Sequence, residues 1–195
     1  MIYKKLLSSQ ALKSIKDFKK KNKGIIDIIV YGSFSRGKID FNDLDLAILF
    51  EEKKDINEKM SIAQQLRSLI KKEVNYELDI KAIDMSDLMD ETFLARQAII
   101  SEGYSLLKNK KFSEILGFKS FYLFSYSLKN LTNSQKMMLQ YSLRGRRGQK
   151  GIMELRNCEL LGKGVMKVPT EHSEEFKEFL EKHKITYKIF KGLFY

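Results

Sequence analysis

Apolar positions in the first half of the chain repeat with helical spacing in some segments and with strand-like spacing in others. Periodic apolar residues over 8–22 and 56–70 predict two amphipathic helices. Apolar runs over 25–31, 44–50 and 76–83 predict three strands. The order helix–strand–strand–helix–strand is typical of an α/β (α+β) fold in which helices flank a sheet.

The second half of the chain predicts a smaller set of elements. A helix that begins at Thr132 or Asn133 is expected to end at Gly145, a residue type that often terminates helices. The segment from Gly145 to Gly151 predicts a flexible basic loop. A strand, a helix and a second strand are expected at 164–168, 171–183 and 185–190. These elements predict a small basic α/β domain.

Positive charge is concentrated in this second half. We place a domain boundary after the lysine-rich segment at residue 110, which gives domains at 1–110 and 111–195. The first domain has 20 Lys and Arg against 17 Asp and Glu, and the second has 16 against 8. This asymmetry suggests an anionic partner for the second domain, although a lysine-rich genome or adaptation to heat would also produce it.

The composition is that of a protein with a core and no membrane span. Apolar residues make up 43% of the chain, but no apolar run approaches the roughly 20 residues that a membrane helix needs. Cys158 is the only cysteine, which excludes an intrachain disulfide. We expect a cytoplasmic protein that has no membrane partner.

The most informative chemistry lies between the first two predicted strands. Asp43 and Asp45 begin the second strand, and alternation places both on one face. Positions two apart lie roughly 6.6 Å apart, so their carboxylates can converge on one cation. At about 4 Å, two unscreened carboxylates would repel by about 4 kcal/mol, and a divalent ion would remove that cost. All-oxygen ligands favour Mg²⁺ or Mn²⁺ over zinc.

A glycine–serine corner precedes these aspartates. Gly32 can adopt the positive φ of a tight turn, and it leaves the backbone amides near Ser33 accessible to an anion. A phosphate-binding corner next to metal-binding carboxylates indicates a nucleoside triphosphate site.

These residues resemble a known family. Gly32-Ser33, nine intervening residues and then Asp43-Leu44-Asp45-Leu46 resemble the signature of the DNA polymerase β-type nucleotidyltransferase superfamily, especially its minimal members. The resemblance covers the first half of the chain and implies a palm-like mixed sheet. It also implies that Gly32 and Ser33 hold the triphosphate and that the two aspartates hold two Mg²⁺ ions.

The resemblance further implies a third carboxylate on a later strand. Glu77, Asp79 and Lys81 share one face of the strand predicted at 76–83. We assign Asp79 as the third metal ligand or base, with Glu77 as the alternative if the register differs by two. The expected catalytic and metal-binding residues are therefore Asp43, Asp45 and Asp79.

The implied reaction transfers a nucleoside monophosphate from a triphosphate, expected to be ATP, to an acceptor hydroxyl and releases pyrophosphate. Arg36 or Lys38 could neutralise charge on the leaving group. A surface ion pair between Arg36 and Asp40 is an equally good interpretation of that arginine.

The second domain contains a long segment without acidic residues. No Asp or Glu occurs between Glu114 and Glu154. Aromatic residues in this window have helical spacing, and we interpret them as core rather than as base-stacking groups. For the basic residues we favour binding to nucleic-acid phosphates over a solvated helix end, and the candidates are Lys136, Arg144, Arg146, Arg147 and Lys150.

Three functions remain open at this point. The basic second domain favours RNA as the nucleotide acceptor. Some minimal members of the family resemble antitoxins that adenylylate a partner protein, which gives a second enzymatic alternative. The third alternative is a non-catalytic module that binds nucleotide or RNA.

Overall fold

The first half of the chain forms a five-stranded sheet in the order β3-β2-β1-β4-β5. The computed structural model describes residues 7–195. Strands β2 and β3 are parallel and joined through helix α2, and the other pairs are antiparallel. The strands are β1 (Ile25–Tyr31), β2 (Asp43–Phe50), β3 (Glu77–Asp84), β4 (Tyr104–Ser105) and β5 (Lys110–Lys111). The mixed sheet predicted from the sequence and the family resemblance is confirmed.

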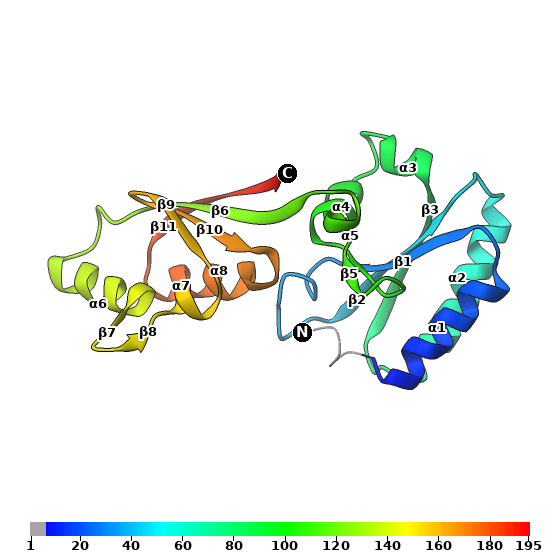
Figure 1. Cartoon of the computed structure of the whole chain (residues 1–195), viewed down its shortest axis with the longest axis horizontal. Coiled ribbons are helices and arrows are strands. Elements are labelled where there is room, and N and C mark those ends of the chain that lie inside the picture. The colour runs from blue at the N-terminus through cyan, green and yellow to red at the C-terminus, as the bar shows by residue number, and fades with distance from the viewer. Residues whose placement is uncertain (1–6) are drawn as a thin grey trace. The chain divides into compact units, whose positions relative to one another are not determined.

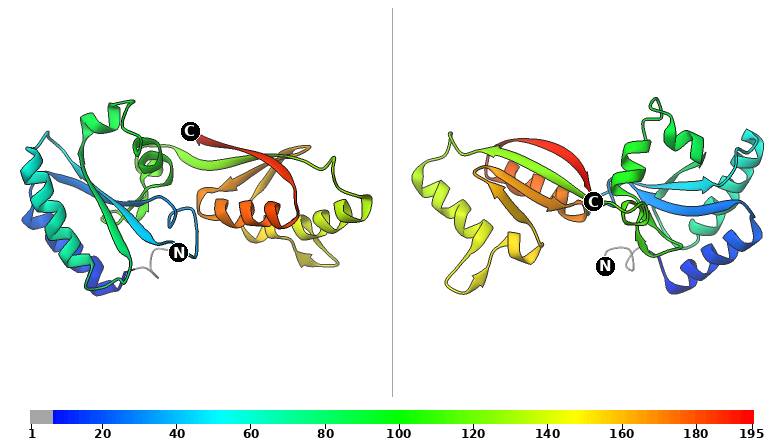
Figure 2. Two further views of the ribbon diagram at one scale, coloured as in Figure 1. Left: turned by 180° about the vertical axis from the view of Figure 1, so that it is seen from behind. Right: turned by 45° about the horizontal axis from the view of Figure 1, so that its top comes forward.

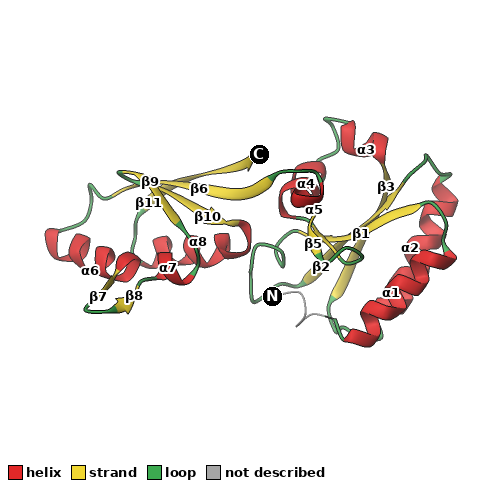
Figure 3. Cartoon of the chain, in the orientation of Figure 1, coloured by secondary structure: helices red, strands yellow, loops and turns green. Residues whose placement is uncertain are grey.

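Helices cover both faces of this sheet (Figures 1 and 3). Leu44, Leu46 and Ile48 point to one face and share a core with α1 and α2, while Ala47 and Leu49 point to the face that packs against α4 and α5. Asp43 and Asp45 alternate in phase with Ala47, so they belong to this second face. The helices are α1 (Ser9–Lys21), α2 (Ile56–Ile70), α3 (Met85–Met89), α4 (Arg96–Glu102) and α5 (Phe112–Ile115).

Local sequence explains where the two long helices begin. The Ser8 hydroxyl accepts a hydrogen bond from the backbone amide of Ala11, and the Asp55 carboxylate accepts one from Asn57. Helix α1 ends in a lysine-rich turn, which interacts favourably with the helix dipole. The two long helices and the first three strands lie where the hydrophobic pattern predicts them.

The second half forms a separate four-stranded antiparallel sheet in the order β11-β6-β10-β9. Helices α6 and α8 pack on one face of it, with Leu139, Leu143, Phe176 and Leu180 in the shared core (Figure 2). This is a βαββαβ arrangement, in which a short hairpin and α7 are inserted after α6. The elements are β6 (Lys119–Ser127), α6 (Asn133–Arg144), β7 (Gly145–Arg146), β8 (Gln149–Lys150), α7 (Ile152–Leu155), β9 (Glu159–Gly162), β10 (Val165–Pro169), η2 (Thr170–His172), α8 (Ser173–Lys182) and β11 (Thr186–Phe194).

The chain divides into two compact units, Met1–Gly117 and Phe118–Tyr195. The boundary predicted after residue 110 falls within β5, between Lys110 and Lys111. Strand β5 pairs with β4, and the buried side chain of Phe112 contributes to the core of the first unit. We refer to the two parts as the first unit and the second unit.

One local prediction in the second unit was wrong. The aromatic residues after residue 118, whose spacing also fits a helix, lie in a strand, because Tyr122, Phe124 and Tyr126 alternate along β6 and point toward α6 and α8. The expected flexible loop after Gly145 is instead a two-stranded hairpin that turns at Arg147 and Gly148, both with positive φ. The interpretation of the aromatic residues as core holds for Phe121, Tyr122 and Phe124, which are buried. Within residues 7–195, no helix is long and apolar enough to cross a bilayer.

Candidate active site

Pairing of β2 with β3 and β1 aligns acidic residues across neighbouring strands. In the parallel pair, Asp45 lies directly opposite Asp79, and Asp43 lies opposite Glu77. In the antiparallel pair, Asp45 lies opposite Tyr31. Directly paired residues project to the same side of a sheet, so Asp43, Asp45 and Asp79 share one face. The structure therefore brings the three predicted carboxylates together at the end of two strands.

Close contact with the glycine corner determines the position of Asp45. Gly32 has a φ of +77°, and a Cβ atom at this position would lie 2.1 Å from Oδ2 of Asp45. Any other residue would therefore displace this carboxylate and strain the turn. Burial, with a further contribution from the nearby carboxylates of Asp43 and Asp79, raises the pKa of Asp45 to about 6. The carboxylate is thus crowded and partly removed from water.

The hydroxyl of Tyr31 is buried beside these acids. The side chain is only 4% exposed, and the hydroxyl has no hydrogen-bond partner among the described residues. Burial raises the pKa of Tyr31, and the charges of Asp45, Asp79 and Asp43 raise it further. A buried polar group without a partner is uncommon and indicates a ligand or water at this point. Sequence reasoning missed Tyr31, although it directly precedes the glycine corner.

The donor set fits a hard divalent cation, but the side chains do not enclose a site. Lys81 Nζ lies 2.8 Å from Asp79 Oδ2 and draws that carboxylate into an ion pair. Among residues 7–195, no three His, Cys, Asp or Glu side chains are close enough to hold a metal ion. Oxygen donors on one face, a raised Asp45 pKa and the unpartnered Tyr31 hydroxyl fit Mg²⁺ or Mn²⁺ if Asp79 releases Lys81.

The loop between Gly32 and β2 is held by its own backbone and by stacked rings. The amide of Arg36 donates to the carbonyl of Gly32, and the amide of Lys38 donates to that of Ser33. The rings of Phe34, Phe41 and Tyr76 pack in sequence, with centroid separations of 5.2 and 4.3 Å. Tyr76 immediately precedes β3, so this aromatic contact links the glycine corner to the strand that carries Asp79.

The two basic residues predicted to bind nucleotide have different environments. Nη1 of Arg36 lies 2.7 Å from Oε2 of Glu102, whose side chain is fully buried at the end of α4. Arg36 is thus paired with Glu102, whereas a surface pair with Asp40 was one of the two interpretations of this arginine. Lys38 is exposed on the loop. Glu102 has no recognisable signal in the sequence, because it is 66 positions away from Arg36 and approaches it only in the folded chain.

The basic residues predicted to bind nucleic acid fall into two groups in the second unit. Lys136 and Arg144 line a groove beside α6. Arg146 stacks over Tyr141 at 4.5 Å, and Lys150 forms an ion pair with Glu154 at 2.7 Å. Arg147 lies at the turn of the β7–β8 hairpin. The predicted single basic surface is thus a groove and a separate hairpin.

Solved structures with weak similarity include toxin–antitoxin complexes. One, described as tri-AMPylated Shewanella oneidensis HEPN toxin in complex with MNT antitoxin, is 21% identical, covers 50% of this chain and 69% of its own, and has a TM-score of 0.34. A toxin–antitoxin structure with AMP-PNP is 24% identical, covers 49% and 71%, and has a TM-score of 0.37. A third structure, from Shewanella oneidensis, is 18% identical, covers 68% and 89%, and has a TM-score of 0.37.

A family sequence profile matches the chain more clearly than the solved structures do. No curated protein matches the chain. The sequence profile described as "Polymerase beta, Nucleotidyltransferase" matches residues 13–112, about half of the chain. The matched region contains the glycine corner, both aspartates of β2 and the carboxylates of β3. The chain therefore belongs to the polymerase β nucleotidyltransferase family.

Proposed function

We propose that this protein transfers a nucleoside monophosphate from a nucleoside triphosphate, ATP in the first instance, to an acceptor hydroxyl. The observation that carries the proposal is the alignment of Asp43, Asp45 and Asp79 on one sheet face beside Gly32 and Ser33. Like charges crowded at a partly buried position favour binding of a divalent cation, and the adjacent corner suits a triphosphate.

Each residue would have a distinct role in the reaction. Asp43 and Asp45 would hold Mg²⁺ or Mn²⁺, and Ser33 with its neighbouring amides would orient the triphosphate. When bound, the divalent ions would neutralise phosphate charge and lower the pKa of the attacking hydroxyl. Asp79, once released by Lys81, would bind the same ions or accept the hydroxyl proton.

Bond changes in the proposed step follow from this placement. The acceptor oxygen attacks the α-phosphorus, the bond from that phosphorus to the bridging oxygen breaks, and pyrophosphate leaves with both electrons of that bond. The hydroxyl proton passes to Asp79 or to solvent. Arg36 and Lys38 lie on the loop next to the corner, where their positive charge would stabilise the leaving pyrophosphate.

We propose a hydroxyl of a partner protein as the first acceptor to test. Adenylylation of a partner was the alternative suggested by the minimal members of the family. An AMPylated toxin bound to its antitoxin is what one of the compared structures contains. The proposal rests on the family resemblance, and label transfer to protein or to RNA decides the acceptor class.

RNA is the second candidate acceptor. The observation in its favour is the cationic groove of the second unit, which includes Lys136 and Arg144. A groove that holds a polynucleotide would supply an acceptor of this class with a binding site, although binding alone would not make it the acceptor.

The test uses the purified chain with α-³²P-labelled ATP, CTP, GTP or UTP and Mg²⁺. Total RNA and the protein fraction of the native host are supplied separately as acceptors. Label on a discrete protein supports the first acceptor, and label on RNA supports the second. Nucleotide binding without label transfer or pyrophosphate release from any mixture would favour the non-catalytic alternative and overturn the proposal.

A further inference from the structure

The second unit contains an open groove of about 830 Å³ formed by three segments of the chain. One wall is the exit of β6 from Tyr126 to Lys129, and another is a single face of α6. The third wall is the hairpin that joins β9 to β10, from Leu160 to Gly164. A volume of this size is within the range of small-molecule and cofactor sites.

Four positively charged side chains line the groove, and no carboxylate does. They are Lys129, Lys136, Arg144 and Lys163. Within the part of the chain that the structure describes, none of the four forms an ion pair. Other basic residues of the same unit do so, among them Lys150, Arg156 and Lys167. The positive charge of the groove is therefore available to a ligand.

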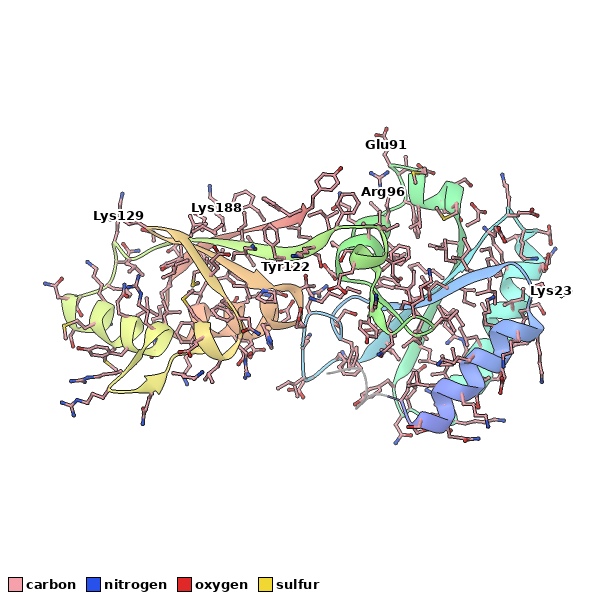
Figure 4. The ribbon with its side chains drawn as sticks, in the orientation of Figure 1. Lys23, Glu91, Arg96, Tyr122, Lys129 and Lys188 are labelled. Carbon is pink, nitrogen blue, oxygen red and sulfur yellow. The ribbon has the colours of Figure 1, made fainter. Side chains whose placement is uncertain are left out.

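The helix holds its basic residues in a fixed row. Lys136, Gln140 and Arg144 are spaced four apart, so they lie along one stripe of α6. A capping box between Thr132 and Gln135 fixes the start of this helix, and Gly145 ends it. Lys129 extends from the loop between β6 and α6 (Figure 4) and also lines the groove.

Apolar side chains also line the groove. Tyr126, Leu128, Leu143 and Leu160 contribute to the lining, and Leu161 is 51% exposed. Apolar surface between cations suits a ligand that carries sugars or planar bases together with its phosphates. Inorganic phosphate has no such groups. Gly162 adds a position where a Cβ atom would meet nothing within 4 Å, so a ligand can approach the backbone there.

From these observations, we propose that this groove binds a single strand of nucleic acid. Lys129, Lys136, Arg144 and Lys163 would contact successive phosphates, and the apolar lining would contact sugars and bases. The site lies wholly within the second unit and does not depend on the proposed transfer reaction. A catalytically inactive variant should therefore bind the strand as the wild type does.

Fluorescence anisotropy of the full chain tests the proposal with labelled oligouridine and oligothymidine of about 20 nucleotides. Charge removal by Lys136→Gln with Arg144→Gln should weaken binding roughly 10- to 30-fold at 0.1 M salt. The same double variant should reduce the slope of log K against log salt by about 1.4, the value for two lost phosphate contacts. Binding of either strand supports the proposal, and failure of both to bind would overturn it.

A matched control removes one arginine and one lysine from the hairpin instead. Arg147→Gln with Lys150→Gln should weaken binding less than about threefold, because these side chains lie outside the groove. Equal losses for the two double variants would assign the effect to net charge and overturn the groove. Polyglutamate that displaces the oligonucleotide at a lower concentration would also overturn it, because an acidic protein segment would then be the better ligand.

A third variant tests the groove without removing a cation. Leu161 is about half exposed, so Leu161→Glu should leave the fold intact while placing a carboxylate among the four cations. We expect it to weaken binding at least threefold and Leu161→Met to bind as the wild type does. Unchanged binding in Leu161→Glu, with an unchanged melting temperature, would exclude this groove.

Discussion

The two units concentrate charge of opposite sign in different physical settings. In the first unit, the crowded carboxylates lie partly buried on a sheet, and this burial raises the pKa of Asp45 to about 6. In the second unit, Lys136 and Arg144 line an open groove, where water and salt screen their mutual repulsion. Repulsion between like charges therefore costs more free energy in the carboxylate cluster of the first unit than in the groove of the second unit.

Because of this difference, the two sites would bind different kinds of ligand. A partly buried carboxylate cluster favours a small divalent ion, which relieves the repulsion at short range. An exposed row of cations favours an extended polyanion, whose binding depends on released counterions and therefore on salt. Variants of the first unit can test whether its carboxylate cluster is partly buried and costly in free energy.

The largest effect is expected when one carboxylate of the first unit is removed. Asp45→Asn should reduce nucleotide transfer by about 10³-fold or more, because Asp45 would hold the divalent ions and is central in the row of acids. Pyrophosphate release measures the loss. Asp40→Asn, which changes an exposed acid of the adjacent loop, is the control and should retain wild-type turnover. Wild-type activity in Asp45→Asn would remove the metal-ligand assignment.

A smaller structural effect is expected at the glycine corner. Gly32→Ala should destabilise the fold by about 1–2 kcal/mol, because alanine must adopt a φ of +77° there. The new methyl group must also displace Asp45 Oδ2, which would lie 2.1 Å from it, so Mg²⁺ affinity should fall as well. Urea unfolding and calorimetric Mg²⁺ titration measure the two effects. Gly117→Ala is a control for backbone strain alone, since its φ is +87° and its Cβ would meet nothing within 4 Å.

The sequence predicts which carboxylates of the first unit share a sheet face, but it does not predict their ion-pair partners. Alternation along β2 places Asp43 and Asp45 on one face, and the same rule along β3 places Asp79 in phase with Lys81. The side-chain pairing of Asp79 with Lys81 depends on rotamers, which a pattern does not specify. The contact between Arg36 and buried Glu102 depends on the docking of α4, so no local signal exists for it.

The fold of the second unit was harder to predict, because the aromatic residues of its first strand fit both a helical and a strand-like period. Aromatic residues of β6 occur both at helical spacing and at alternate positions, and only pairing with β10 and β11 decides between them. That pairing also assembles the groove, since the amide of Tyr126 donates to the carbonyl of Gly164 across the β6–β10 pair. Lys129 and Lys163 line the same groove as a result of this long-range pairing, which composition cannot reveal.

The raised pKa of Asp45 predicts how the stability of the first unit depends on pH. Its pKa is about 6 in the folded chain and near 3.8 when unfolded, so the folded state binds more protons between these values. Stability contributed by this group is therefore present below pH 4 and is lost as the pH rises through 6. Without metal, Asp45→Asn should become progressively more stable than the wild type across this range.

Urea unfolding of both proteins at several pH values measures this difference, and Mg²⁺ provides the control. Binding of the ion requires the ionised carboxylate, so Mg²⁺ affinity of the wild type should decrease below pH 6. A stability difference between the two proteins that does not vary from pH 4 to pH 7 would show that Asp45 is not crowded in solution.

The smallest effect concerns Lys81, which would compete with a metal ion for Asp79. The ion pair is partly exposed and contributes little to stability, so Lys81→Met should change the melting temperature only slightly. Release of Asp79 should nevertheless tighten Mn²⁺ binding by about two- to fivefold, measured by electron paramagnetic resonance of free Mn²⁺. Lys72→Met removes the same charge from an exposed position of the first unit and should leave Mn²⁺ affinity near the wild-type value. Weaker Mn²⁺ binding in Lys81→Met would mean that this lysine positions Asp79 for the metal rather than withholding it, and the cluster would then be more preorganised than the ion pair suggests.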